Sequence, residues 1–459
     1  MESLTEARVM PVGEMTAPCL RVDIEVSAGV PGIPPQPRPA GARCAWLLVR
    51  VHTEAVGSLI LEVPPEGLTG EQVTAGIMGE LGPEITRRSE MQGGESSLPA
   101  FLASRAEILG RAPKMTAVVC TRERPQGLEA CLRSLLAQRY PSFSVLVVDN
   151  APMTDRSKSV VSSLTSSAVE YVVEPRRGLS WARNRALEMV DEGIVAWIDD
   201  DETADVHWLA ELARGFHDHP EADAVSGVMV PGELETWAQV WFEQYGGHNK
   251  HRGFTSAVFS PDTAHVQSPF YPLPPFGTGG NMAFRVDALT RIGGFDVSLG
   301  AGSRCRGGED TRAFTDLLCS GGTLVYQPTA VTCHFHRRSF EELQQQMRGN
   351  GVGLTAFYTS LVLTRPRCVP ELIRLLPMVY RDLFGSESLR SGALPSTYPV
   401  ELRRANRRGL LIGPVAYLRA RSEAAQLDQM TARRDLVRRR RRRLGAGLLD
   451  RRPEAAGSE

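Results

Sequence analysis

Three consecutive carboxylates follow a short apolar run in the middle of the chain. Val195–Ile198 (VAWI) leads directly into Asp199–Asp201. Neighbouring carboxylates repel one another by about 1 kcal/mol per pair even in water, and more where they are desolvated. A divalent cation removes this repulsion, and hard oxygen ligands suit Mg²⁺ or Mn²⁺. The alternative interpretation is an acidic loop before a helix at His207–Phe216, with Asp205 as its N-cap.

Arginines stand at two expected helix starts. Thr121–Pro125 (TRERP) follows an apolar run and places Arg122 and Arg124 where a helix opens, and Gly178–Arg185 opens a second helix. The positive end of a helix dipole together with guanidinium groups suits a diphosphate, although ordinary capping explains the first segment equally well. Asp149 ends another apolar run and could accept a hydrogen bond from a nucleobase, or be a turn residue.

A second acidic pair opens a later helix. Gly307–Asp310 (GGED) precedes an expected helix at Thr311–Ser320. One interpretation is an N-cap stabilised by the helix dipole. The other is a general base that is ionised at pH 7, in a site where glycines let the substrate approach closely.

Two further segments are candidates for ligand contact. Phe276–Arg285 is a glycine-rich bend that allows close backbone approach, but it lacks the Gly-Lys-Ser/Thr of a phosphate-binding P-loop. His334 and His336 alternate after a β-run, so both imidazoles fall on one strand face. A lone histidine is usually structural, whereas an alternating pair suggests ligand binding.

Strands and helices alternate around these residues. We expect helices at Leu128–Gln138, Ser157–Leu164 and Ser180–Asp191, and strands at Met115–Cys120, Phe143–Val148, Val169–Val173 and Ile194–Ile198. Short apolar strands that alternate with helices are typical of a parallel sheet covered on both faces. Ligands bind beyond the carboxyl ends of such strands, which is where the polar motifs lie.

The chain divides into three parts by composition. Residues 1–110 predict a small α+β accessory module, with strands at Cys44–Val51 and Ser58–Val63 and a helix at Gly70–Leu81. Residues 111–360 contain all the motifs above. Residues 361–459 predict a helical, basic extension whose end we expect to be disordered. Residues 401–459 hold 16 arginines against seven acids, about +9, which leaves about −10 for the rest.

Composition restricts the class of protein. The chain has 459 residues, 42% of them hydrophobic, which excludes a disordered protein. Its eight cysteines are scattered without a C-x-x-C pair, which argues against a zinc site or a disulfide framework. No signal-peptide pattern and no run of about 18 apolar residues is visible, so we expect a cytoplasmic protein. The net charge of −1 does not favour nucleic acid. The basic tail is either solvated or docks on anionic lipid at the inner face of the membrane.

The order of these motifs resembles an inverting family 2 glycosyltransferase that uses a nucleotide-diphosphate sugar. The resemblance extends from about Lys114 to Tyr358 and covers the matching parts Thr121–Pro125, Asp149-Asn150, Gly178–Arg185, Asp199–Asp201, Gly277–Asn281, Glu309-Asp310, and His334 with His336. It implies an α/β fold, a Rossmann-like GT-A core, flanked here by the small α+β module and the Arg-rich helical extension that the minimal family core lacks.

The resemblance also implies a role for each motif. Contacts to the donor would come from Thr121, Arg122, Arg124, Asp149, Arg183, Asp199, Asp200, Gly279, Gly280 and Asn281. A Mn²⁺ or Mg²⁺ ion would be held by Asp201 and Asp199, with His334 or His336 assisting. Asp310 would be the catalytic base, and Glu309 would shape the site or touch the acceptor.

These residues predict one reaction. The enzyme would move a sugar from a nucleotide-diphosphate donor to a hydroxyl of a glycan, lipid-linked or small-molecule acceptor, with inversion, assisted by the metal and the aspartate base. The alternatives are another metal-dependent nucleotide-binding enzyme, such as a nucleotidyltransferase, or a scaffold without activity. The nucleotidyltransferase would not need the Gly308–Asp310 helix start or the histidine pair, and the presence of all the candidate acidic residues argues against a scaffold.

Overall fold

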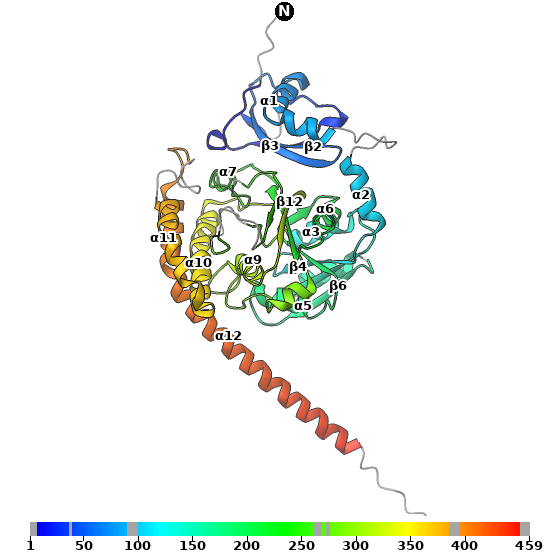
Figure 1. Cartoon of the computed structure of the whole chain (residues 1–459), viewed down its shortest axis with the longest axis vertical. Helices are drawn as coiled ribbons and strands as arrows, with labels where there is room; N and C mark the ends of the chain where they lie inside the picture. The colour runs from blue at the N-terminus through cyan, green and yellow to red at the C-terminus, as the bar shows by residue number, and fades with distance from the viewer. Residues whose placement is uncertain are drawn as a thin grey trace, which may run out of the picture.

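The structure, a computed structural model, describes residues 7–35, 39–89, 100–164, 166–250, 252–260, 268–271, 276–384 and 394–449. A small N-terminal module lies above a larger body, and the C-terminal helices run along one side (Figure 1). The strands are β1 (Leu20–Glu25), β2 (Cys44–Val51), β3 (Glu54–Glu62), β4 (Met115–Thr121), β5 (Phe143–Asn150), β6 (Val169–Glu174), β7 (Ile194–Asp199), β8 (Glu202–Ala204), β9 (Ala224–Pro231), β10 (Ala257–Phe259), β11 (Met282–Arg285) and β12 (Leu324–His334). The α-helices are α1 (Gly70–Ser89), α2 (Ala100–Gly110), α3 (Pro125–Leu136), α4 (Arg156–Ser163), α5 (Leu179–Leu187), α6 (Trp208–Asp218), α7 (Trp237–Gln244), α8 (Val286–Arg291), α9 (Glu309–Cys319), α10 (Phe340–Thr364), α11 (Val369–Phe384) and α12 (Val400–Leu449).

The body is built on a nine-stranded sheet. Its strands follow the order β10-β12-β9-β11-β7-β4-β5-β6, and β8 pairs with β12. The strands β7, β4, β5 and β6 are parallel, as the alternation of apolar runs and helices predicts. The sheet as a whole is mixed, because β11 is inserted antiparallel between β7 and β9. The parallel arrangement expected from the sequence is therefore correct for β4 to β7, and β9 and β12 also pair parallel to each other, whereas β11 breaks the pattern.

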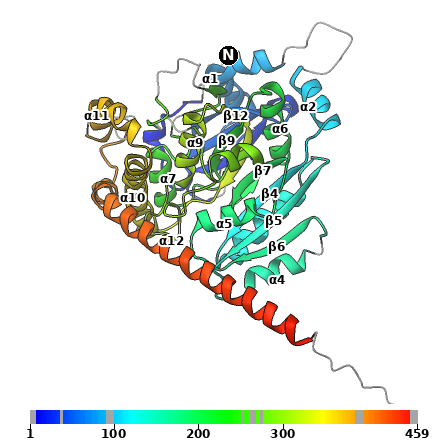
Figure 2. The same cartoon turned by 60° about the horizontal axis from the view of Figure 1, so that its bottom comes forward.

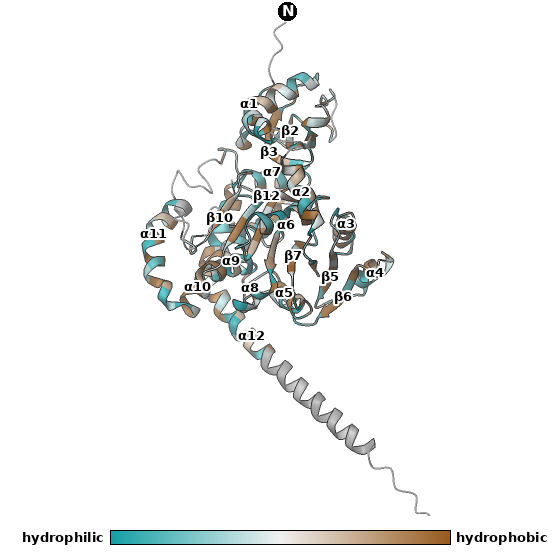
Figure 3. Cartoon of the chain, turned by 45° about the vertical axis from the view of Figure 1, so that its right-hand side comes forward, coloured by the Kyte–Doolittle hydropathy of each residue, from teal (hydrophilic) through white to brown (hydrophobic). Residues whose placement is uncertain are grey.

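Helices cover both faces of this sheet. The amphipathic α3 and α6 bury Leu128, Leu132 and Leu212 against one face. On the other face, α5 and α9 bury Ala182 and Phe314. The strands of the sheet are coloured mostly as hydrophobic, as two covered faces require (Figure 3).

The N-terminal module is a three-stranded sheet, β1-β2-β3, with α1 packed on it. Helix α1 extends beyond the expected Leu81 to Ser89. Met15 and Trp46 belong to the same hydrophobic core as Trp197 of the body, so the module is packed directly against the large sheet. Hydrogen bonds across the boundary include Cys19 N to Leu234 O at 2.8 Å.

The C-terminal part is helical, as predicted. Helix α12 crosses α10 and continues past the body as an extended rod (Figures 1 and 2). The arginine run lies on this rod, and the expected disordered end lies at 450–459, outside the described residues. Among the described residues, no helix is both long enough and apolar enough to cross a membrane.

Candidate active site

The carboxyl ends of three neighbouring strands bring the predicted motifs together. In the sheet register, Thr121 of β4 is paired with Asp149 of β5, and Cys120 of β4 with Asp199 of β7. The Thr121 hydroxyl then donates a hydrogen bond to Asp200 at 2.8 Å. The parallel strands thus assemble a polar edge from segments that lie far apart in the sequence.

A cavity of about 480 Å³ opens at this edge, a volume typical of small-molecule sites. The predicted site residues that line it are Thr121, Arg122, Arg124, Asp199, Asp200, Asp201 and His334. Polar lining residues outside the predicted set are Asn150, Arg177, His248, Arg337 and Gln346. Asp149, Arg183, Gly279, Gly280, Asn281, Glu309, Asp310 and His336 lie behind or beside this lining.

The acidic triplet is only partly neutralised by arginines. Arg124 Nη1 lies 3.0 Å from Asp200 Oδ1 and 2.7 Å from Asp201 Oδ2, and Arg337 Nη2 lies 3.3 Å from the same Asp201 oxygen. Burial, opposed by the positive charge of Arg183 and reinforced by the neighbouring carboxylates, raises the pKa of Asp199 to about 6. The cluster therefore holds negative charge that a cation would stabilise.

Glu202 adds a fourth carboxylate that the predicted set of site residues lacks. It follows the triplet directly, and it is buried with no hydrogen-bond partner for either side-chain oxygen among the described residues. Burial raises its pKa well above the usual range. Carboxylate oxygens of Asp199, Asp201 and Glu202 lie within 4.8 Å of one another. Four consecutive acids were the available signal in the sequence, and the fourth faces the same point as the first and third.

The two predicted histidines have different surroundings. His336 Nε2 lies 2.8 Å from Glu243 Oε1, and its Nδ1 lies 2.8 Å from His334 Nδ1. If His336 Nε2 donates a hydrogen bond to Glu243, its Nδ1 accepts one from the N–H at His334 Nδ1, which leaves the lone pair of His334 on Nε2. That nitrogen lies 3.6 Å from Asp201 Oδ1. Burial and the neighbouring His336 lower the pKa of His334 well below its usual range, so the ring is neutral.

The direct metal contact of His336 stays a prediction, since His248, His334 and His336 each offer a ligand atom within 4.8 Å of the others. Both ring nitrogens of His336 already have protein partners, and its ring is buried behind His334. Its position is that of a residue that orients a ligand through a hydrogen bond. His248, whose ring centroid lies 4.4 Å from that of His334, completes the group, and no local sequence pattern marks it.

Arg183 connects the acidic triplet to the start of α9. Its guanidinium is fully buried and lies 3.0 Å from Glu309 Oε1, 2.9 Å from Gly279 O and 3.5 Å from Asp199 Oδ1. This geometry supports an internal link between Asp199 and Glu309 rather than the predicted direct contact with the nucleotide.

Asp310 is held at the N-terminus of α9 by backbone hydrogen bonds. Its carboxylate accepts from Gly279 N at 2.8 Å and from Thr311 N at 2.6 Å. The helix can begin here because Gly308 has a φ of +89°, a left-handed conformation that favours glycine. Unlike Glu309, which is buried, Asp310 is half-buried and retains access to solvent.

The predicted glycine-rich segment serves close packing. A Cβ on Gly280 would lie 1.8 Å from Glu202 Oε1, and one on Gly279 would lie 2.7 Å from Arg183 Nη2. Asn281 is fully buried, donates to Val228 O and Ala330 O, and accepts from Trp208 Nε1. These hydrogen bonds give Asn281 a structural role, so its predicted contact with the donor has no geometric support.

Asp149 is buried with one oxygen unused. Its Oδ2 accepts from Tyr171 at 2.7 Å, and its Oδ1 has no partner among the described residues. Burial raises the pKa of Asp149. Asn150, the next residue, lines the cavity and accepts a hydrogen bond from Gly178 N at 2.8 Å, which ties the start of α5 to the end of β5.

Comparison with known proteins shows what the part of the chain that carries this site is similar to. Residues 116–293 match the family model described as "Glycosyl transferase family 2". The chain carries a family 2 glycosyltransferase domain. The glycosyltransferase has the GT-A fold and transfers a sugar from a nucleotide donor, as the sequence predicts. The two alternative functions, a nucleotidyltransferase-like enzyme and a scaffold, are not supported.

Relatives of the glycosyltransferase act in different contexts. Over 231 residues it is 27% identical to the glucosyl-dolichyl phosphate glucuronosyltransferase of Haloferax volcanii. This alignment covers 48% of this chain and 69% of that protein. Over 221 residues it is 31% identical to the succinoglycan biosynthesis protein ExoM of Rhizobium meliloti, which covers 46% of this chain and 63% of ExoM. A similar solved structure is the mannosyltransferase PcManGT from Pyrobaculum calidifontis in complex with GDP-Man and Mn²⁺, with a TM-score of 0.43 and 21% identity over 72% of this chain and 89% of that one.

Proposed function

We propose that this enzyme transfers its sugar with inversion, assisted by a divalent cation, with Asp310 as the base. The acceptor oxygen forms a bond to the anomeric carbon while the bond from that carbon to the diphosphate breaks. The acceptor proton passes to Asp310, and the nucleoside diphosphate leaves. The observation that supports this proposal is that an acidic cluster and arginines line one cavity, and that Arg183 pairs both with Asp199 of this cluster and with Glu309, the residue before Asp310.

The residues present fit a divalent cation. Asp199, Asp201 and Glu202 offer oxygen ligands, and His334 offers a neutral imidazole whose Nε2 faces Asp201. The two unpartnered oxygens of buried Glu202 are the kind of group that a cation stabilises. When bound, Mn²⁺ or Mg²⁺ would neutralise charge on the departing diphosphate. Arg122 and Arg124 line the same cavity and would add positive charge.

The experiment that tests the metal proposal is nucleotide binding with and without the cation. Calorimetry with UDP and GDP, in Mn²⁺ or in EDTA, should show affinity that depends on metal in the wild type and is lost in Asp201→Ala. Glu233→Ala removes an acidic residue that does not line the cavity and should bind like the wild type. Equal affinity in Mn²⁺ and EDTA for the wild type would overturn the metal proposal.

We also propose that the enzyme works next to anionic lipid. The six arginines at 438–443 favour such a surface, since each basic residue near it contributes about 1 kcal/mol. Removal of residues 433–459 should weaken binding to vesicles that contain phosphatidylglycerol at low salt and leave turnover of a soluble acceptor unchanged. Equal vesicle binding by both proteins would contradict this proposal. A cytoplasmic location at the inner membrane face is part of it.

A further inference from the structure

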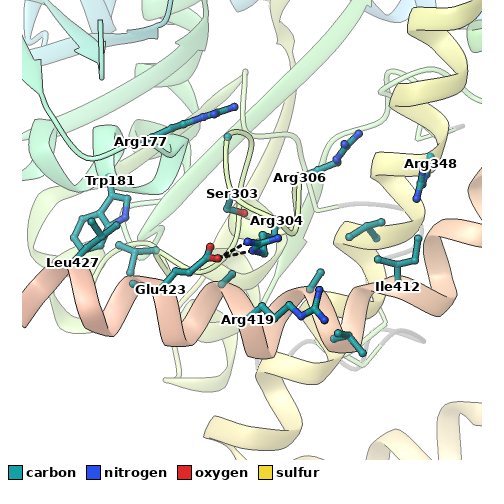
Figure 4. A pocket seen from close by; sticks show the side chains of 17 residues that line it. Arg177, Trp181, Ser303, Arg304, Arg306, Arg348, Ile412, Arg419, Glu423 and Leu427 are labelled. Carbon is teal, nitrogen blue, oxygen red and sulfur yellow. Dashed lines mark hydrogen bonds and ion pairs between the residues drawn. The ribbon is translucent and has the colours of Figure 1, made fainter.

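A second cavity, of about 550 Å³, lies beside the cavity of the candidate active site, which we call the donor cavity. Helix α12 forms one wall, and α10, the start of α5 and the loop before α9 form the others (Figure 4). Arg177 and Gly302 line both cavities, so the two meet at this point. The loop that borders the second cavity at Arg304 and Arg306 leads directly into Asp310.

Five arginines from four segments surround this second cavity, which we call the arginine groove. They are Arg177, Arg304, Arg306, Arg348 and Arg419. The acid in the lining is Glu423, and it lies 2.6 Å from Arg304. The other four arginines make no ion pair or side-chain hydrogen bond with the residues that the structure describes. They come from the loop after β6, the loop before α9, helix α10 and helix α12 (Figure 4).

Four unpaired guanidinium groups around one space favour a multivalent anion. Arginine binds phosphate through two parallel hydrogen bonds, and it is less strongly hydrated than lysine. A solvated surface would distribute such arginines over several faces, whereas these approach the same cavity from separate elements. The groove therefore has the charge and the donors for a phosphate group.

The rest of the groove is apolar. Trp181, Val352, Ile412, Val415 and Leu427 belong to its lining. Val415 is 50% exposed and Leu427 37% exposed, so apolar surface is open to solvent along α12. A free sugar phosphate would leave this apolar surface exposed to water. A phosphate carried by an apolar chain would cover it, at about 25 cal/mol per Å² of apolar surface removed from water.

We propose that the arginine groove binds the phosphate of an acceptor that carries an apolar chain. The acceptor phosphate would lie beside the donor cavity, near the loop that leads into Asp310. This inference rests on the proposed transfer reaction for its meaning, but it concerns a separate group of residues. The groove uses α12, which lies outside the matched family 2 region at 116–293.

Titration of the full-length protein with three probes tests the proposal. The probes are citronellyl phosphate, the matched alcohol citronellol, and inorganic phosphate, each followed by calorimetry. We expect citronellyl phosphate to bind at least tenfold more tightly than either of the others. If inorganic phosphate binds as tightly as citronellyl phosphate, the apolar chain does not contribute and the proposed kind of acceptor is wrong. If citronellol binds as tightly as citronellyl phosphate, the groove is not a phosphate site.

Variants on α10 and α12 locate the binding. Arg348→Ala combined with Arg419→Ala should weaken binding of citronellyl phosphate at least tenfold. Arg421→Ala, two residues along α12 and outside the groove lining, should bind it like the wild type. All three positions are exposed, so the fold should be retained, which circular dichroism checks. Unchanged affinity in the double variant would overturn the assignment.

Nucleotide binding separates this proposal from the proposed function. The Arg348→Ala/Arg419→Ala variant should bind UDP or GDP as the wild type does. Loss of nucleotide affinity in this variant would place the groove in the donor site and overturn the inference. A wild type that binds citronellyl phosphate through these arginines but shows metal-independent nucleotide binding would support the groove and contradict only the metal proposal.

Discussion

Arg183 is the residue on which the geometry of the active site depends. It is fully buried and contacts Asp199 on one side and Glu309 on the other. A buried arginine is stabilised only by charged or hydrogen-bonded partners, so it fixes the distance between the acidic triplet and the start of α9. Arg183 therefore connects the acidic triplet to the first residue of α9.

Replacement of Asp310 by Asn tests the proposal that Asp310 is the catalytic base. Asn keeps the shape but removes the proton acceptor, so turnover should fall by about 10²–10⁴. Donor affinity should hardly change, because Asp310 contacts Gly279 N and Thr311 N rather than the donor cavity. Initial rates and donor calorimetry measure both. Glu309→Gln is the control and should cost less turnover. If Asp310→Asn keeps more than a tenth of the activity, Glu309 is the next candidate.

Glu309 should make stability depend on pH. Burial, together with the charge of Asp310, raises the pKa of Glu309 to about 7 from its ordinary value of 4.5. The folded state thus holds this proton more tightly, and the free energy of unfolding falls as pH rises from 4.5 to 7, by up to about 1.4 kcal/mol per unit. Glu309→Gln lacks this proton, so its stability should fall less steeply. Denaturant unfolding at pH 5, 6, 7 and 8 measures the slopes, and parallel curves would refute the assignment.

At the scale of elements, glycines allow α12 to lie close against α10. A Cβ on Gly409 would lie 2.2 Å from Arg348 O, and one on Gly351 would lie 2.1 Å from Asn406 O. The carbonyl of one helix therefore touches the backbone of the other. This close crossing sets the width of the arginine groove, since Arg348 and Arg419 are on the two helices.

Gly409→Ala should separate the two helices. The added methyl group has no room, and overpacking of this kind costs about 1–3 kcal/mol. Gly79→Ala in α1 is the matched control. Nothing lies within 4 Å of the position of its Cβ, so the better helix propensity of Ala should stabilise the protein by about 0.5–1 kcal/mol. Denaturant unfolding of both variants measures the difference in sign, and a stabilising Gly409→Ala would contradict the tight crossing.

At the scale of the whole molecule, buried charges join the N-terminal module to the body. Glu54 of β3 forms ion pairs with Arg88 of α1 and Arg214 of α6. Arg105 of α2 lies 2.7 Å from Glu211 of α6. Since the side chains of Glu54, Arg214, Arg105 and Glu211 are almost entirely buried, separating the module from the body would expose them or leave them without their partners. The module is thus part of one packed unit with the catalytic domain.

Glu54→Ala should destabilise the protein by about 3–5 kcal/mol, because it leaves buried Arg214 without this partner. Glu62→Ala is the control on the same strand. Its ion pair with Arg8 is about half exposed, and such pairs contribute only about 0–1 kcal/mol. Unfolding in urea compares the two variants. A loss for Glu54→Ala no larger than that for Glu62→Ala would show that the module and the body are not joined through this residue.

The sheet from β4 to β7 and the polar residues at its carboxyl edge could be predicted from the amino-acid sequence. Apolar periodicity reports burial, and parallel strands place their ends together, so Thr121, Asp149 and Asp199 could be predicted as neighbours. Glu309 and Asp310 were visible because glycines and a helix start surround them.

Which of these side chains face the cavity depends on packing that the local sequence does not show. Arg183 and Asn281 are directed into the protein, and His336 lies behind His334, because contacts from segments far away in the chain occupy their polar atoms. The insertion of antiparallel β11 and the formation of the arginine groove also depend on contacts between segments that are distant in sequence. Local patterns record whether a residue is buried, whereas the partner that buries it is fixed by packing between elements distant in sequence.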